Sequence, residues 1–123
     1  MKIELKERID DLVTQNEIVL FIKGTVKFPQ CGFSGMIIAI FKEVGMPFET
    51  MNILADDALR QGMKEYSAWP AFPQVYVGGR FAGGAETIRQ LYRSNELMAY
   101  VENAIRNRVH VIDIGSESKE MEQ

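Results

Sequence analysis

Apolar residues in the first part of the chain follow two different spacings. At residues 3–15 they recur every three or four positions, which predicts an amphipathic helix. Residues 17–23, EIVLFIK, form a nearly continuous apolar run that is too short for a core helix and is typical of a buried parallel strand. Residues 31–44 contain the apolar run MIIAIF, and Gly45 and Pro47 after it are typical of a helix end.

The rest of the pattern adds a strand, a hairpin and further helices. In VYVGGRF, Gly78-Gly79 joins two short strands, because a type I′ turn needs positive φ at both central positions. The expected elements are a strand at 48–54, a helix from Asp56 or Asp57 to Ser67, a hairpin at 75–81, and a helical region at 85–108 broken near Ser94-Asn95. This order predicts an α/β fold, a mixed four-stranded sheet flanked by helices on both faces.

The length of 123 residues is that of one ordinary domain. We expect that domain at residues 1–108, followed by a flexible C-terminal tail at 109–123, because SESKEMEQ has a disordered composition. VHVIDI, at the start of this tail, leaves open a small extra edge strand.

The formal net charge is −3 and no basic block is present, which argues against nucleic-acid binding. No apolar run approaches the length of a membrane span. The N-terminal MKIELKERIDDL is too charged for a signal peptide and too acidic for a transit peptide. We therefore expect a cytoplasmic protein, or alternatively one in an organelle matrix after removal of a transit peptide.

Cys31, in the stretch PQCGFSG, is the single cysteine, and Ser34 stands where a dithiol redox protein has its second. At a predicted helix N-terminus, unpaired N–H groups and the helix dipole favour an anion. Lys23 and Lys27 add positive potential, so the sequence predicts a thiolate. The alternative is a buried, inert cysteine, but the polar and glycine flanks are poor core material.

Two chemistries remain open for one thiolate. It can attack a mixed disulfide and then be released by an outside thiol, or it can ligate a soft metal. Iron–sulfur clusters usually take four thiolates, so two chains would supply two and small thiols in solution the others. Zinc is disfavoured, because His110, the only histidine, lies in the tail, far from metal-ligand spacing.

Several spaced motifs, in one order, closely resemble the monothiol glutaredoxins of the CGFS type. They are KGT at 23–25, CGFS at 31–34, LRQGMKEYSAWPAFPQVYVGG at 59–79 and GGAET at 83–87, and the resemblance runs from about residue 4 to 106. It implies the thioredoxin fold and glutathione bound beside the cysteine. It also implies a homodimer holding a [2Fe–2S] cluster on two protein cysteines and two glutathione thiols, with apo iron–sulfur acceptor proteins and BolA-type proteins as partners.

Carried over by position, Cys31 would be both the cluster ligand and the nucleophile. Lys23 and Arg60 resemble the family residues at the glycyl carboxylate of glutathione, where a guanidinium can bind two oxygens. Lys64, one helical turn from Arg60, would support it. Without the resemblance, a solvated loop side chain is the better interpretation of Lys23. For Arg60 and Lys64, on a helix, a solvated side chain is as good an interpretation as a ligand contact.

Phe72-Pro73 resembles the family's cis-proline site, where the Phe72 backbone pairs with the cysteinyl part of glutathione. Gly83 and Gly84 precede a helix, so their N–H groups would cradle the γ-glutamyl carboxylate. Trp69 resembles a position near the groove and the partner surface. The alternatives without a ligand are a trans Pro73 in a loop, a turn at Gly83-Gly84, and a Trp69 that serves only in packing.

Three positions depart from the family pattern. Ala85 stands where the family has a second cysteine, so an internal disulfide with Cys31 cannot form. Glu86 replaces an aspartate at the amino group of glutathione and has a longer arm, while Ala71 removes a hydroxyl beside the groove. We expect weaker glutathione binding, by at most about 1 kcal/mol per lost hydrogen bond.

The sequence thus favours a glutathione-dependent [2Fe–2S] cluster carrier or scaffold. A glutathione-dependent monothiol oxidoreductase that removes glutathione from proteins is the alternative, with activity that is weak at most. A third hypothesis is an adaptor that binds a partner through the Trp69 region and the tail, in which Cys31 is incidental.

Overall fold

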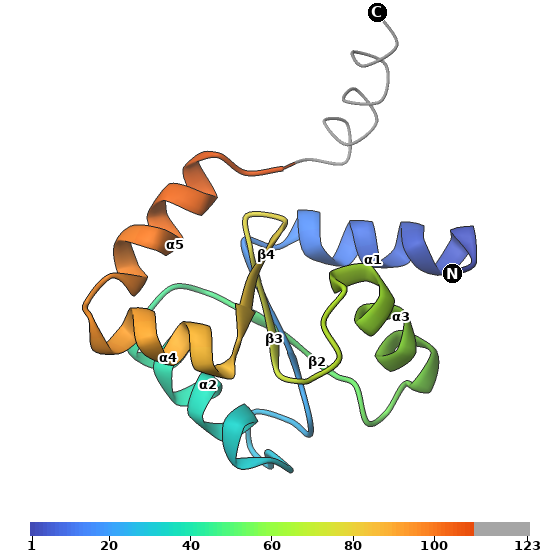
Figure 1. Ribbon diagram of the computed structural model, residues 1–123, viewed down its shortest axis with the longest axis horizontal. Coiled ribbons are helices and arrows are strands. Elements are labelled where there is room, and N and C mark those ends of the chain that lie inside the picture. Colours follow the sequence, from blue (N-terminus) through green and yellow to red (C-terminus); the bar gives the residue numbers. More distant parts are fainter. Residues whose placement is uncertain (110–123) are drawn as a thin grey trace, which may run out of the picture.

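The computed structural model describes residues 1–109. The helices are α1 (Ile3–Gln15), α2 (Gly32–Val44), α3 (Asp57–Ser67), α4 (Ala85–Arg93) and α5 (Leu97–Arg106). The strands are β1 (Ile18–Ile22), β2 (Glu49–Asn52), β3 (Gln74–Val77) and β4 (Arg80–Gly84). The strands form one sheet in the order β2-β1-β3-β4, with helices on both sides of it (Figure 1).

The sheet is mixed. β1 pairs in parallel with β2 and antiparallel with β3, and β3 pairs antiparallel with β4. β1 is therefore a central strand, which explains its uninterrupted apolar sequence. Val19 and Phe21 pack on one face, whereas Ile18, Leu20 and Ile22 pack on the other.

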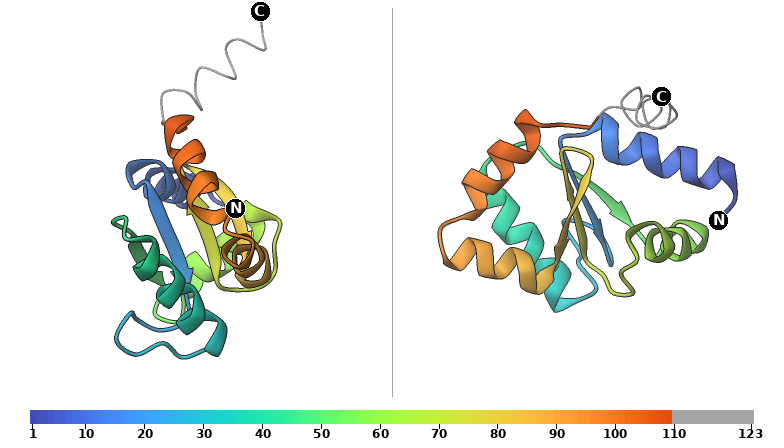
Figure 2. Two further views of the ribbon diagram at one scale, coloured as in Figure 1. Left: turned by 90° about the vertical axis from the view of Figure 1, so that its left-hand side faces the viewer. Right: turned by 45° about the horizontal axis from the view of Figure 1, so that its top comes forward.

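The helices divide between the two faces of the sheet, as Figures 1 and 2 show. α1 and α3 cover one face, where Ile9, Leu59 and Met63 are fully buried. α2, α4 and α5 cover the other, where Ile37 and Ile88 are fully buried. Because both faces are covered, the core consists of two apolar layers, one on each side of the sheet.

Local signals in the sequence set the ends of several elements. The Asp56 side chain accepts a hydrogen bond from Leu59 N at 3.0 Å and so caps α3. α2 ends at Gly45, which has φ 80° in the left-handed region. The β3–β4 turn needs positive φ at two successive residues, and Gly78 and Gly79 have φ of 61° and 83°.

The expected mixed four-stranded sheet flanked by helices on both faces is confirmed. The predicted hairpin was too short, because Gln74 and Val75 pair with Gly84 and Gly83, which the sequence assigned only to the start of a helix. Of the predicted tail at 109–123, only Val109 is described, and its N–H donates to Gly78 O at 2.8 Å. The predicted flexibility of the tail and its extra edge strand fall outside the described residues, and the domain boundary at 108 stays a prediction. Among residues 1–109, no helix is long and apolar enough to cross a membrane.

Candidate functional site

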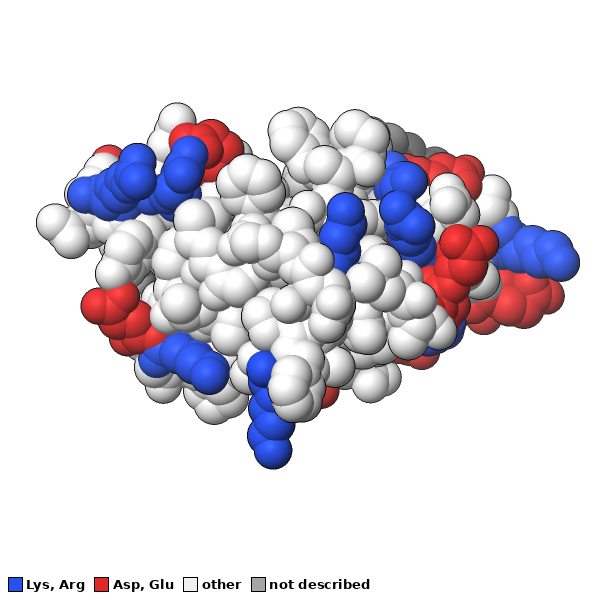
Figure 3. Space-filling model, turned by 90° about the horizontal axis from the view of Figure 1, so that it is seen from below, with Lys and Arg blue, Asp and Glu red and all other residues white. Residues whose placement is uncertain are grey.

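The candidate residues gather at the carboxyl end of β1. Phe21 lies opposite Gln74, and Gln74 lies opposite Gly84, so three strands meet in one row there. The loop that leads to Cys31 follows this row directly, and Phe72-Pro73 precedes it. Figure 3 views the molecule from this side and shows Lys and Arg side chains spread around a broad uncharged surface.

Cys31 is the N-cap residue of α2 and is partly exposed. The backbone N–H groups of Ser34 and Phe33 face its sulfur, although no complete hydrogen bond caps the helix through this side chain. The Ser34 N–H is the largest cause that lowers the pKa of the thiol below its ordinary value, while partial burial opposes it. Phe33 N–H, the Lys23 charge and the Ser34 hydroxyl add to the lowering. The pKa of the thiol is thus shifted in the direction that the sequence predicted, although Lys27 is not among the causes.

The loop from Lys23 to Gln30 is held by its own hydrogen bonds. Gln30 N donates to Lys23 O at 2.8 Å, and Thr25 N donates to Phe28 O at 3.2 Å. Gly24 has φ 97°, and a Cβ there would lie 2.5 Å from Phe28 O, so glycine is required. Phe28, at the outer end of the loop, is 72 % exposed.

Ser34 ties this loop to α2. Its side chain is fully buried, and its Oγ accepts a hydrogen bond from Lys23 N at 3.0 Å. The Lys23 side chain has no ion pair within residues 1–109 and is half-buried beside the thiol. Lys23 and Cys31 are therefore brought together, in agreement with the sequence prediction.

Phe72-Pro73 is a cis peptide, as the resemblance implied. The Phe72 side chain is 7 % exposed and packs in the core layer under α1 and α3. Within residues 1–109, the loop and cap hydrogen bonds include none from Phe72 N–H or to Phe72 C=O. Both backbone groups therefore lack a hydrogen-bond partner in the described part of the chain. The neighbouring Trp69 is 44 % exposed, and the centroid of its ring lies 6.2 Å from that of Phe81.

Gly84 is the N-cap of α4, and Trp69 approaches it closely. A Cβ at Gly84 would lie 3.0 Å from Trp69 Nε1 and 3.5 Å from Pro73 O. Gly83 has φ 136°. No side chain caps α4, so its first N–H groups have no side-chain partner at the cap. These glycines and the cis-proline loop therefore lie side by side.

Ala85 opens α4 and supplies no thiol or hydroxyl. Glu86, in the first turn, forms an ion pair with Arg89 on the same helix. Its carboxylate already has a partner, which the sequence did not anticipate. A ligand's amino group would have to compete with Arg89 for it.

Arg60 and Lys64 lie on α3 and are half-buried. Neither side chain has an ion pair within residues 1–109, and the buried Arg60 Nε has no hydrogen-bond partner there. α3 begins just beyond β2, at the same end of the sheet as Cys31. Arg60 is thus a guanidinium with unused donors, although no contact joins it directly to Cys31.

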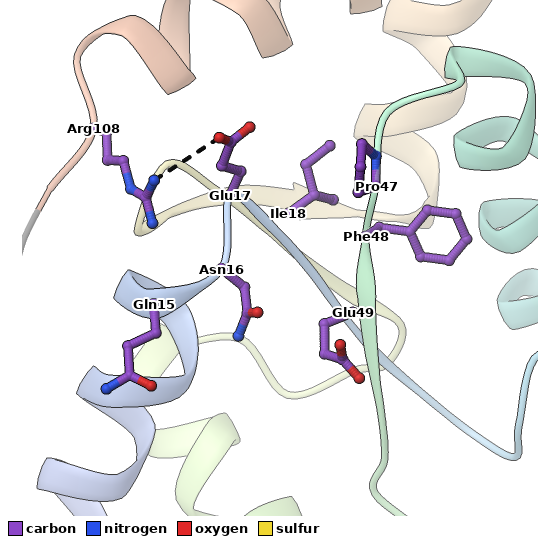
Figure 4. A pocket seen from close by; sticks show the side chains of 8 residues that line it. All are labelled: Gln15, Asn16, Glu17, Ile18, Pro47, Phe48, Glu49 and Arg108. Atoms are coloured by element: carbon purple, nitrogen blue, oxygen red, sulfur yellow. Dashed lines mark ion pairs between the residues drawn. The ribbon is translucent and has the colours of Figure 1, made fainter.

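A cavity of about 440 Å³ lies elsewhere, at the start of β1 (Figure 4). Its lining includes Asn16, Phe48 and Glu49, together with Glu17 and Arg108, whose charged groups are 3.9 Å apart. No cysteine lines it. The chemistry of the thiol is therefore at the other end of β1, on an open surface.

Within residues 1–109, no group of three or more His, Cys, Asp and Glu side chains is arranged to hold a metal ion. One chain offers one thiol, that of Cys31. Any metal or cluster bound there needs further ligands from outside the described part of the chain.

The sequence profile of the Glutaredoxin family matches residues 18–82. The chain is 50 % identical over 105 residues to an uncharacterized monothiol glutaredoxin, ycf64-like, from Synechocystis, covering 85 % of this chain and 98 % of that protein. It is 47 % identical over 102 residues to monothiol glutaredoxin-S14, chloroplastic, from Arabidopsis thaliana, covering 83 % of this chain and 59 % of the relative. The solution structure of reduced poplar apo GrxS14 superposes with a TM-score of 0.73 at 50 % identity, over 82 % of this chain and 93 % of that one.

The open sheet, the N-cap cysteine and the cis-proline loop define a protein of the thioredoxin/glutaredoxin fold. The chain belongs to the glutaredoxin family and, within it, to the monothiol glutaredoxins. Both the fold and the family expected from the sequence are thereby confirmed.

Two polar residues of this region were missed in the sequence. Asn52, at the end of β2, accepts hydrogen bonds through Oδ1 from Gly24 N at 2.9 Å and Leu54 N at 3.0 Å. Gln74 lies fully buried at the start of β3. The available signal was a lone amide side chain at a strand end, since such residues commonly hydrogen-bond the neighbouring backbone.

Proposed function

We propose that this monothiol glutaredoxin binds glutathione beside Cys31 and carries a [2Fe–2S] cluster between two copies of the chain. The cluster is a cargo to be delivered during iron–sulfur protein maturation. The observation that carries the proposal is the partly exposed Cys31 sulfur at the N-cap of α2, with the pKa of its thiol lowered. Thiolate is the form that ligates iron.

Features around the thiol fit a tripeptide with two carboxylates. Lys23 and Arg60, without ion pairs in the described part of the chain, suit the glycyl carboxylate. The free backbone groups of Phe72 suit the strand-like pairing of a peptide. Gly83 and Gly84, at the start of α4, suit the γ-glutamyl carboxylate. In this assignment, Pro73 shapes the groove and Lys64 supports Arg60.

Ala85 and Glu86 would contact the γ-glutamyl end of glutathione. The ion pair of Glu86 with Arg89 competes with the ligand's amino group, and Ala85 and Ala71 offer no side-chain hydrogen bond. We therefore propose that glutathione binds through its carboxylates and backbone more than through its amino group.

Ligand number supports the two-chain carrier. A [2Fe–2S] cluster takes four ligands, and each chain offers one cysteine. Two Cys31 thiolates and two glutathione thiolates complete the set, so the cluster-bound protein is a homodimer. Glutathione thiols exchange with solution, which leaves the cluster transferable to apo iron–sulfur acceptor proteins. A BolA-type protein is the other proposed partner.

Anaerobic reconstitution with iron, sulfide and glutathione tests this proposal. The wild-type protein should become brown, absorb in the visible range and elute as a dimer. Cys31→Ser and wild type without glutathione should remain colourless monomers. A colourless wild-type protein under these conditions, or equal loading of Cys31→Ser, would refute cluster binding through Cys31.

The lowered thiol pKa also favours a second candidate, weak glutathione-dependent oxidoreductase activity. Here the Cys31 thiolate attacks the glutathione sulfur of a mixed disulfide, that S–S bond breaks, and the target leaves as a thiolate that takes a proton from water. A second glutathione thiolate then attacks the glutathione sulfur on Cys31, which frees the enzyme and forms oxidised glutathione. Efficient turnover of a glutathionylated peptide without cluster loading would favour this activity over the carrier.

The proposed compartment is the cytoplasm, with an organelle matrix as the alternative. The Arabidopsis relative is named as chloroplastic, whereas other relatives, such as that of Synechocystis, are bacterial. Fractionation of the source cells with an antibody to this protein distinguishes the two.

A further inference from the structure

Gln74 is a polar side chain in an apolar layer. It is fully buried at the start of β3, on the face covered by α1 and α3. Its Nε2 donates to Trp69 O at 3.0 Å and to Ala71 O at 3.2 Å. Its Oε1 is buried with no partner within residues 1–109. Burying an amide whose oxygen has no partner is unfavourable for folding. A functional role for Gln74 would explain why this position holds an amide.

The two carbonyls belong to the loop that precedes the cis peptide. Trp69 is held by several other contacts, because its N–H donates to Lys64 O at 3.2 Å and to Ser67 Oγ at 3.1 Å. Ala71, by contrast, has no hydrogen bond within residues 1–109 other than the one from Gln74. The orientation of the Ala71 carbonyl therefore depends on the Gln74 amide.

A peptide unit is planar, and in its trans form the C=O and N–H point in opposite directions. The Ala71 carbonyl and the Phe72 N–H belong to one such unit, since Phe72-Pro73 is the only cis bond of the described chain. Because the Ala71 carbonyl faces buried Gln74, the Phe72 N–H points away from Gln74. That is the N–H to which the proposed function assigns a hydrogen bond with glutathione.

We propose that Gln74 is a positioning residue, whose buried amide fixes the Ala71–Phe72 peptide and thereby aims the Phe72 N–H at the glutathione backbone. This inference rests on the proposed glutathione site. It assigns Gln74 an effect on ligand affinity, through the loop, in addition to its effect on stability. Gln74 itself does not touch the ligand.

Gln74→Met tests the inference, because methionine has a similar volume and shape but no donor. The matched control is Val77→Ala, at the other end of the same strand, fully buried on the opposite face. Both variants lower the free energy of unfolding. Only Gln74→Met should weaken glutathione binding in calorimetry, about two- to tenfold, as expected for one misaligned hydrogen bond.

Amide NMR distinguishes a positioning role of Gln74 from a role in stability alone. On titration with glutathione, the wild-type protein should show shifts at both Phe72 and Gly84. Gln74→Met should lose the Phe72 response and keep that of Gly84. Wild-type affinity with a normal Phe72 response in Gln74→Met overturns the inference, as does equal weakening in Val77→Ala.

Hydrogen exchange in the unmodified protein keeps the inference testable if Gln74→Met does not fold. An outward Phe72 N–H should exchange rapidly in the free protein and become protected when glutathione is added. Protection of Phe72 in the free protein overturns the positioning role while leaving glutathione binding intact. Absence of any glutathione binding by the wild-type protein overturns the proposed function, and this inference with it.

Discussion

Replacing Ser34 by alanine should affect both stability and thiol chemistry, because one buried hydroxyl serves both. Ser34 Oγ accepts the Lys23 N–H at 3.0 Å and is fully buried. Removing it leaves a backbone N–H without its partner, which costs about 1–3 kcal/mol of unfolding free energy. At about 4 °C per kcal/mol for a domain of roughly this size, the melting temperature should fall by about 4–12 °C.

The same substitution should raise the pKa of Cys31. The Ser34 hydroxyl is one of the groups that lower it, although the backbone N–H of residue 34, the largest cause, stays in place. The pH profile of Cys31 alkylation by iodoacetamide should therefore shift to higher pH, but not to the profile of a free cysteine.

Ser94→Ala is the matched control, because Ser94 is exposed and its hydroxyl donates only to Leu91 O, at 3.2 Å. It should change the unfolding free energy by less than about 0.5 kcal/mol. Urea denaturation at constant pH and the alkylation profile measure both effects. An unchanged urea midpoint together with an unchanged alkylation profile in Ser34→Ala would show that the hydroxyl contributes to neither property.

Three further predictions concern the ends and loops of the same region. Gly24→Ala should destabilise the fold by about 1–3 kcal/mol in urea, because φ 97° and a Cβ 2.5 Å from Phe28 O strain the loop, and a neutral result contradicts that reading. Asp56→Ala should cost about 1 kcal/mol through loss of the α3 cap on Leu59 N. The pKa of Asp56 is lowered chiefly by that N–H. The stability that the carboxylate contributes is therefore complete above the ordinary pKa near 3.8 and is lost as pH falls through the lower folded pKa. A Tm difference between wild type and Asp56→Ala that persists in stronger acid argues against the cap. The pKa of Cys31 is likewise lowered. The stability that its thiolate contributes is therefore complete above the ordinary pKa of about 9.0 and is lost as pH falls through the folded pKa. The stability advantage of wild type over Cys31→Ser should therefore grow with rising pH, and a flat difference in chemical denaturation across that window excludes a perturbed thiol.

The helices and strands could be predicted because their signals are local. β1 is apolar along its whole length since it is central and covered on both faces, and Gly45 and Gly78-Gly79 mark ends that need positive φ. The extent of β4 could not be predicted in the same way. Gly83 and Gly84 have the sequence of a turn, and only pairing with Val75 and Gln74 makes them strand residues.

The candidate site was predicted in part. The lowered thiol pKa followed from the helix N-terminus, whereas Lys27, close in sequence, has no resolved influence on the sulfur. The ion pair of Glu86 with Arg89 and the role of Ser34 as acceptor for Lys23 N–H depend on side-chain directions that the sequence pattern does not specify. Gln74 shows the same limit, because its partners are carbonyls of a loop whose path is known only once the chain is folded.

The single sulfhydryl at Cys31 has a practical corollary for handling the protein. With one cysteine, the protein cannot form a disulfide within one molecule. Every disulfide that Cys31 forms must add the mass of a second thiol compound or a second polypeptide. In intact mass spectrometry of non-reduced samples, the increase in mass therefore identifies the thiol compound or polypeptide that is disulfide-bonded to Cys31.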